Sequence, residues 1–155
     1  MLQRIQSIYL FLAALVIAGL FIFPLVHNVY VNNTPTTIMV TGIFQDVNGQ
    51  QAHTTFFVAL TAVTAIVALI PLVIMFLYKN RKLQITLCYS AMLVLVGYSY
   101  WVSQLVKNTI DNATINFSNY GIGILLISVS ILLLILAQKA IQRDEKLVKS
   151  ADRLR

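Results

Sequence analysis

This sequence has few charged residues for its length, and it has only one cysteine, Cys88. Asp, Glu, Lys and Arg make up 10% of the 155 residues, whereas 59% are hydrophobic. Ordinary globular domains carry roughly 25% charged residues. So few charges cannot cover the surface of a water-soluble fold of this size, and the expected solvent is the lipid bilayer. A lone thiol excludes an internal disulfide and a Cys-x-x-Cys redox pair.

The chain also lacks the residue spacings that usually mark an enzyme or a metal site. No Gly-x-Ser-x-Gly, His-Glu-x-x-His, P-loop or paired-carboxylate pattern is present. The only histidines are His27 and His53, which without a cysteine or carboxylate cluster would make a poor metal site. We therefore expect no catalytic, cofactor-binding or metal-binding residue, no bound cofactor and no enzymatic activity.

Four long apolar segments are present, at residues 5–26, 56–78, 83–102 and 120–140. A membrane-spanning helix needs about 20 mostly apolar residues. Away from their ends, these segments contain no Asp, Glu, Lys, Arg or His, the residues that mark ion pathways and proton relays. The sequence therefore predicts an all-α membrane protein, a bundle of four transmembrane helices in one domain.

The basic residues are distributed unevenly along the chain. Ten of the eleven Lys and Arg residues precede the first segment, lie between the second and third, or lie at the end of the fourth and beyond it, which leaves Lys107 alone. Cytoplasmic loops carry the excess of Lys and Arg, so both termini are predicted to be cytoplasmic. Because the basic residues adjoin apolar segments, the net charge of +6 does not indicate a nucleic-acid partner.

The first outer loop, residues 27–55, is predicted to form a small β-hairpin that caps the bundle. Val29 and Val31, and later Ile38 and Val40, alternate with polar residues at strand period. Asn48-Gly49 and Thr34-Pro35 are turn and bend signals, respectively. A two-stranded unit is marginally stable in water, so this hairpin would pack on the helix ends.

The charged C-terminal tail, residues 141–155, is predicted to continue the fourth helix into the cytoplasm. Neither glycine nor proline occurs after residue 123, so nothing in the sequence ends the helix at the membrane surface. On a helical wheel the tail has an apolar arc and an opposite basic face. The basic face comprises Arg143, Lys146, Lys149 and Arg153.

The apolar arc of the tail contains Leu147, Ala151 and Leu154, with Asp144 in its middle. A helix lying on lipid would carry Trp or Phe there and no carboxylate. We therefore favour docking of this arc on a partner protein that offers Asp144 a cation or a hydrogen-bond donor. Contact of the basic face with anionic lipid, or a solvated tail that only sets topology, are the alternatives.

Small residues recur every third position in the second segment, and they indicate a face for helix packing. Close backbone approach at such faces is the usual device of membrane helix association. A larger membrane protein complex or a homo-oligomer is the expected partner. The residues are Ala59, Ala62, Ala65 and Ala68.

Both ends of the chain, MLQRIQSIYL at residues 1–10 and RDEKLVKSADRLR at residues 143–155, resemble those of a known family. It is an uncharacterised family of small four-helix bacterial membrane proteins, classed as a domain of unknown function. The resemblance implies a bacterial inner membrane and no established activity, and it assigns no site residue.

These observations favour a non-enzymatic accessory or scaffold subunit of the inner membrane. A small transporter or channel for a neutral solute is the main alternative, because uncharged polar residues remain in the spans. A membrane enzyme acting on lipid or quinone comes third, since no nucleophile and base are recognisable.

Overall fold

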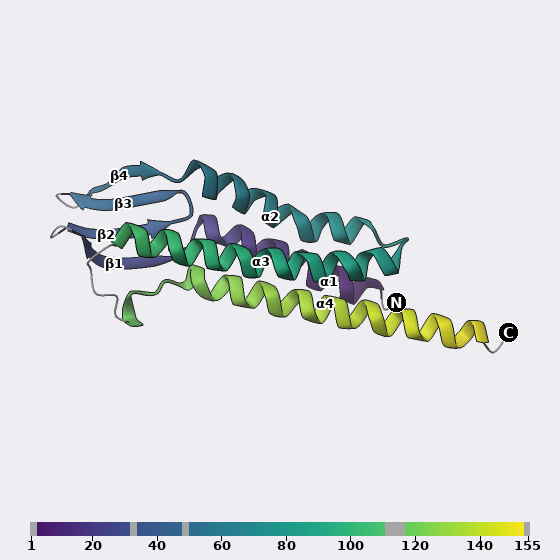
Figure 1. The fold of residues 1–155 in the computed structure, drawn as a ribbon. Helices are drawn as coiled ribbons and strands as arrows, with labels where there is room; N and C mark the ends of the chain where they lie inside the picture. Colours follow the sequence, from purple (N-terminus) through teal and green to yellow (C-terminus); the bar gives the residue numbers. More distant parts are fainter. Residues whose placement is uncertain (1–2, 32–33, 48–49, 111–116, 154–155) are drawn as a thin grey trace.

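A computed structural model describes residues 3–31, 34–47, 50–110 and 117–153, in which four helices adjoin one β-sheet (Figure 1). The elements are α1 (Gln3–Ala18), the short 3-10 helix η1 (Gly19–Phe21), β1 (Val26–Val31), β2 (Thr34–Met39), β3 (Gly42–Val47), β4 (Gln50–Phe56), α2 (Val58–Phe76), α3 (Arg81–Ile110), the 3-10 helix η2 (Phe117–Asn119) and α4 (Ile122–Arg153).

The four-stranded antiparallel sheet contradicts the predicted all-α fold with a small hairpin loop. The strands follow one another in the order β1-β2-β3-β4. Thr34-Pro35, predicted as a bend, begins β2, with Pro35 opposite Tyr30. Asn48-Gly49 lies outside the described residues, and the flanking strands pair with Val47 opposite Gln50. The strand β4, QQAHTTF, has no apolar alternation to reveal it, and its ladder with β3 spans from Gly42↔Phe56 to Val47↔Gln50.

The sheet contributes to the hydrophobic core rather than lying on it as a separate cap. Val26 and Val29 of β1 and Ile38 of β2 are almost completely buried, as is Val40 in the following turn. All four belong to the same buried cluster as the helix residues. The inward side chains of β1 and β2 therefore form one hydrophobic core together with the buried side chains of the helices.

Of the four predicted membrane spans, three correspond to helices that are long and apolar enough to cross a membrane among the described residues, whereas the first corresponds to a shorter apolar helix at Ile5–Phe21. α1 has 16 residues and ends at Ala18, after which η1 leads the chain toward β1. The predicted span 5–26 included residues that leave the helix, since Leu25 and Val26 turn their apolar side chains into the core at the sheet. Hydropathy alone does not distinguish this burial from burial in lipid.

The three candidate spans lie near the other predicted segments but differ in length. α2, with 19 residues, falls inside segment 56–78, whereas α3, with 30 residues, extends segment 83–102 by eight residues toward the sheet. α4 runs without interruption for 32 residues and includes most of the charged tail. At 1.5 Å per residue, α4 is about 48 Å long, well beyond the roughly 30 Å hydrocarbon core of a bilayer.

The helices run side by side, and the molecule has two distinct ends (Figure 1). α1 packs mainly on α4 and α2, and α3 packs on α4 and α2. The sheet occupies one end. The N-terminus, the turn between α2 and α3, and the C-terminal part of α4 occupy the other, which we call the charged end. Among the Lys and Arg residues that the structure describes, only Lys107 belongs to the sheet half of the helices.

The inward face of α2 is not the alanine face. Leu60, Thr64, Val67, Pro71 and Ile74 are buried, at helical spacing. Ala59, Ala62 and Ala65 are instead exposed, and Ala68 is half-buried. Packing within the chain therefore uses the larger side chains, and the alanine stripe turns outward.

A hydrogen bond between two buried hydroxyl groups, those of Thr64 and Tyr98, joins α2 to α3 in the core. The Thr64 hydroxyl lies 2.7 Å from the Leu60 carbonyl oxygen and 2.6 Å from the Tyr98 hydroxyl. The Thr64 hydroxyl has a single proton, which it donates to Leu60, so Tyr98 must donate to Thr64. This direction satisfies both buried hydroxyl protons in an apolar environment.

Two glycines bring the start of α4 against the chain that leads into β1. The backbone N–H of Gly121 donates to the Leu25 carbonyl at 2.9 Å, and that of Gly123 donates to the Pro24 carbonyl at 3.0 Å. Next to them, Val26 and Tyr120 form an isolated antiparallel bridge. These backbone contacts tie the sheet to the start of α4, and the Asn119 side-chain amide adds hydrogen bonds to the His27 and Asn28 carbonyls of β1 at 3.2 and 2.8 Å.

Candidate functional site

The two histidines lie on opposite edges of the sheet and do not form a site together. His27 belongs to β1 and His53 to β4, the first and last strands. The His53 ring packs between Phe44, at a centroid distance of 4.3 Å, and Phe56, at 3.8 Å. In the part of the chain that the structure describes, no three His, Cys, Asp or Glu side chains come close enough to hold a metal. The sheet end therefore offers histidine packing rather than a recognisable metal centre.

The charged end holds the principal polar arrangement, an ion pair between α3 and α4. Asp144 is only 8% exposed, and its Oδ2 lies 3.7 Å from Nη2 of Arg81, the first residue of α3. The sequence placed Asp144 in an apolar arc and predicted a cation for it on a docked protein. The structure places that cation within the chain itself. The pair attaches the C-terminal third of α4 to the start of α3, where the helical tail leaves the other helices.

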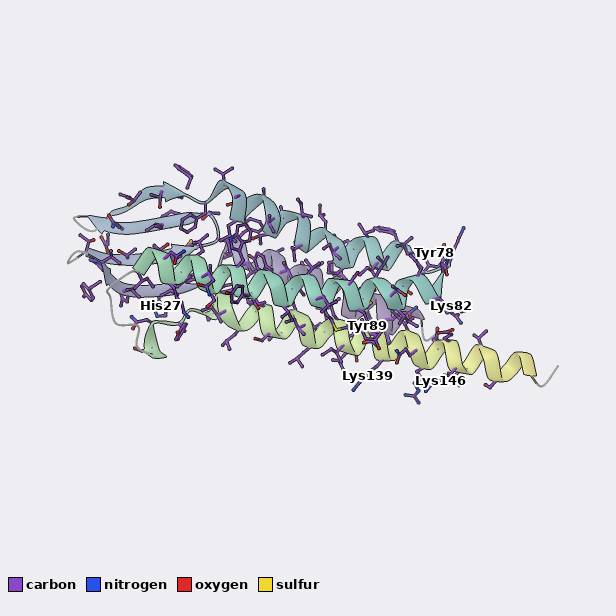
Figure 2. The ribbon with its side chains drawn as sticks, in the orientation of Figure 1. His27, Tyr78, Lys82, Tyr89, Lys139 and Lys146 are labelled. Carbon is purple, nitrogen blue, oxygen red and sulfur yellow. The ribbon has the colours of Figure 1, made fainter. Side chains whose placement is uncertain are left out.

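A recess of about 520 Å³ lies beside this ion pair, between the first turn of α3 and α4. Lys82 and Ile85 line it from α3, and Gln142, Glu145 and Lys146 line it from α4. Figure 2 shows Lys82, Lys139 and Lys146 in this half of the helices, away from the sheet. The recess thus combines cations, an amide and a carboxylate at the charged end.

Buried glutamines add further polar groups to the same end. Gln84, in the first turns of α3, donates from Nε2 to the Ile74 carbonyl of α2 at 2.9 Å. The same carbonyl accepts the Leu77 N–H at 3.2 Å, so Gln84 adds a second donor to a carbonyl in the last turn of α2. The Oε1 atoms of Gln84 and of Gln6 on α1 are buried without a hydrogen-bond partner among the described residues. The position of Gln84 in the sequence does not reveal this role, and only the tertiary contact shows that Gln84 caps α2.

The predicted docking face of the tail is only partly covered by the described side chains. Leu147 is 49% exposed and Val148 is 44% exposed, so α4 presents apolar surface beyond the ion pair. Arg143 and Lys146 of the predicted basic face are also exposed. The side chains of Ala151 and Lys149, and all of Leu154, lie outside the described residues. Arg153 ends α4, and its side chain is likewise not among those described.

The Arg81–Asp144 pair gives the first test of this arrangement. We expect Asp144→Asn to lower the free energy of unfolding by about 1–2 kcal/mol, because a half-buried cation then loses its counter-charge. Fully buried pairs cost more, but the Arg81 side chain is 26% exposed. Urea unfolding of the detergent-solubilised protein measures the loss.

A double-mutant cycle with Arg81→Gln provides the control for this test. If the residues interact, the two single substitutions together should cost less than the sum of their separate effects. Strict additivity, or no loss in Asp144→Asn, would contradict the pair.

Comparison with known proteins gives one match. The family described as Domain of unknown function (DUF4293) matches residues 2–154, nearly the whole chain. No curated protein and no solved structure matches. The match confirms the resemblance seen at the two ends of the sequence and assigns no activity.

Proposed function

The chain belongs to the DUF4293 family, and we propose that it is a non-enzymatic accessory or scaffold subunit of the bacterial inner membrane. In this role it packs against other membrane proteins and holds a cytoplasmic partner on the C-terminal part of α4. The sheet projects on the opposite side of the membrane. The proposal concerns binding, because the described residues include no set of nucleophile, base and metal ligands.

The observation that carries this proposal is the construction of α4. The helix continues past the ends of its neighbours (Figure 1) and is attached to α3 through Asp144 and Arg81 just before it projects. Leu147 and Val148, half-exposed, follow within one turn of Asp144. A helix held at its base loses little conformational freedom when a partner binds, so binding to it costs less entropy than binding to a flexible segment would.

The orientation of the protein follows from the positive-inside rule. Ten of eleven Lys and Arg residues belong to the charged end or its connections, so we place that end in the cytoplasm. The outward alanine stripe of α2, from Ala59 to Ala68, then faces the membrane, where a second membrane protein or another copy of the chain would pack.

Shortening the tail tests the docking role. A variant that stops after Lys146 keeps Asp144 and Arg81 but removes residues 147–155. We expect the amount of partner protein that co-purifies with this variant from native membranes to fall at least tenfold, because the exposed apolar residues are gone. Quantitative mass spectrometry of the purified complexes measures the partner.

The matched control keeps the apolar residues and neutralises the basic face in Lys146→Gln, Lys149→Gln and Arg153→Gln. We expect this variant to retain most of the partner. If it loses the partner as completely as the shortened protein does, lipid attraction rather than apolar docking explains the tail. A wild-type protein that purifies with no stoichiometric partner would contradict the scaffold role.

A further inference from the structure

A second cavity, distinct from the recess at the charged end, lies between α3 and α4 in the half of the helices next to the sheet. Its volume is about 230 Å³. On α3 it extends from Ser99 to Lys107, and on the other side from Ile131 of α4 to Tyr120, two residues before that helix begins. Eight residues of helix correspond to about 12 Å, so the cavity is a slot along the helix axes. Both walls belong to helices that are candidate membrane spans.

The walls of this slot are mainly apolar. Val102 and Val106 line it from α3, and Ile124, Ile127 and Ile131 line it from α4. An unfilled apolar cavity costs stability in proportion to its volume, and water gains few hydrogen bonds inside it. A methylene group occupies a volume similar to that of a water molecule, about 30 Å³, so the volume of the slot accommodates roughly eight methylene groups. Its shape and lining therefore suit one hydrocarbon chain.

The outer end of the slot has the opposite chemistry. Lys107 of α3 and Tyr120, two residues before α4, line it there, and both side chains are exposed. Lys107 is the one Lys or Arg outside the charged end and its connections. Exposed aromatic and basic side chains at the end of a span commonly lie at the level of the lipid headgroups. An amphiphile that enters this slot therefore meets a hydrocarbon-lined interior and a cation at the mouth.

We propose that the slot binds one acyl chain of an anionic glycerophospholipid whose phosphate pairs with the Lys107 ammonium. The length of the slot accounts for the chain, and the charge at its mouth accounts for the headgroup. The proposal goes beyond the scaffold role and does not depend on it, since it uses the sheet half of α3 and α4 rather than the tail. A bound lipid of this kind would fill the space between the two longest helices.

Native mass spectrometry of the full-length protein in detergent tests the proposal with defined lipids. We expect dioleoyl phosphatidylglycerol to bind one to one and about tenfold more tightly than dioleoyl phosphatidylcholine. In Lys107→Gln this preference should disappear, whereas the matched control Lys139→Gln, an exposed position near the middle of α4 and outside the slot lining, should retain it. The preference should also weaken as salt rises, because it is electrostatic.

A second pair of variants tests the slot rather than the charge. Ser128 is exposed and lines the slot, so Ser128→Leu places a side chain in it without disturbing the core. We expect this variant to lose both lipids, while Ser90→Leu, an exposed α3 position outside the slot lining, binds as the wild type does.

Several results would overturn the assignment. These are equal binding by Lys107→Gln and wild type, equal binding by Ser128→Leu and Ser90→Leu, and oleate binding as tightly as phosphatidylglycerol. A dimer that Ser128→Leu converts to monomers without loss of lipid would assign the slot to a second copy of the chain. None of these outcomes depends on whether a cytoplasmic partner binds the tail.

Discussion

Gly121→Ala is expected to lower the free energy of unfolding by about 4 kcal/mol, a large part of the roughly 5–15 kcal/mol by which a typical domain is stable. A Cβ at this position would overlap the carbonyl oxygen of Pro24 and would lie 2.8 Å from the Pro24 carbonyl carbon. These are backbone atoms, so no side-chain rotation relieves the clash. Separation of the two segments would also weaken the hydrogen bonds that Gly121 and Gly123 donate to Leu25 and Pro24, each of which contributes about 1 kcal/mol.

The other glycines provide graded controls for this effect. A Cβ on Gly123 would lie 2.8 Å from the Pro24 oxygen and 3.1 Å from the Phe23 oxygen, so Gly123→Ala should be destabilising but less so. Gly97, inside α3, has no atom within 4 Å of its Cβ position, and Gly97→Ala should leave stability equal or slightly higher. The yield of monodisperse protein in detergent and its unfolding in urea measure the series. Equal behaviour of Gly121→Ala and Gly97→Ala would disprove the backbone contact.

Gly42→Ala is expected to cost about 3 kcal/mol and to act on the sheet rather than on the helices. Gly42 has φ +156°, a conformation that favours glycine. A Cβ there would overlap the Thr55 carbonyl oxygen and lie 2.6 Å from Cε1 of His53. The substitution therefore combines backbone strain with displacement of β4, whose Thr55 and Phe56 lie opposite Ile43 and Gly42.

Hydrogen exchange shows whether the damage is local. Amides of β3 and β4 should exchange much faster in Gly42→Ala, whereas those of α3 and α4 should change little, because the β3–β4 pair is the half of the sheet more distant from the helix junction at β1. The neighbouring variant Thr41→Ala retains the Thr41 carbonyl that accepts from Phe57 and should exchange as the wild type does. Uniformly faster exchange in all helices would contradict a local role for Gly42.

Several features followed from local properties of the sequence. The segments that became α2, α3 and α4 were recognised because about 20 consecutive apolar residues have few folds open to them other than a membrane helix. The continuous tail was expected because α4 contains neither glycine nor proline beyond Gly123. The family resemblance was carried by the two termini and is confirmed over residues 2–154.

Other features depended on contacts between residues far apart in the chain. The sequence predicted a hairpin in place of the four-stranded sheet because β4 is polar. A polar strand has no hydrophobic alternation of its own and is recognised only from the strand that it pairs with. α1 was overextended because hydropathy treats Leu25 the same whether a sheet or lipid covers it. The alanines of α2 were interpreted as a face for helix packing. Small residues permit close approach of a second helix but do not specify which helix, and within the chain α2 packs through its opposite face.

The candidate sites show the same division. The sequence by itself determined that the basic residues gather at one end and that a carboxylate stands in an apolar arc of α4, because composition and helical periodicity are local properties. Only the tertiary structure decided that Arg81 meets Asp144, that Gln84 caps α2, and that Lys107 borders an apolar slot. Each of these contacts depends on how two antiparallel helices are aligned along their axes. That alignment is set by the summed contacts of the whole core, not by any segment alone.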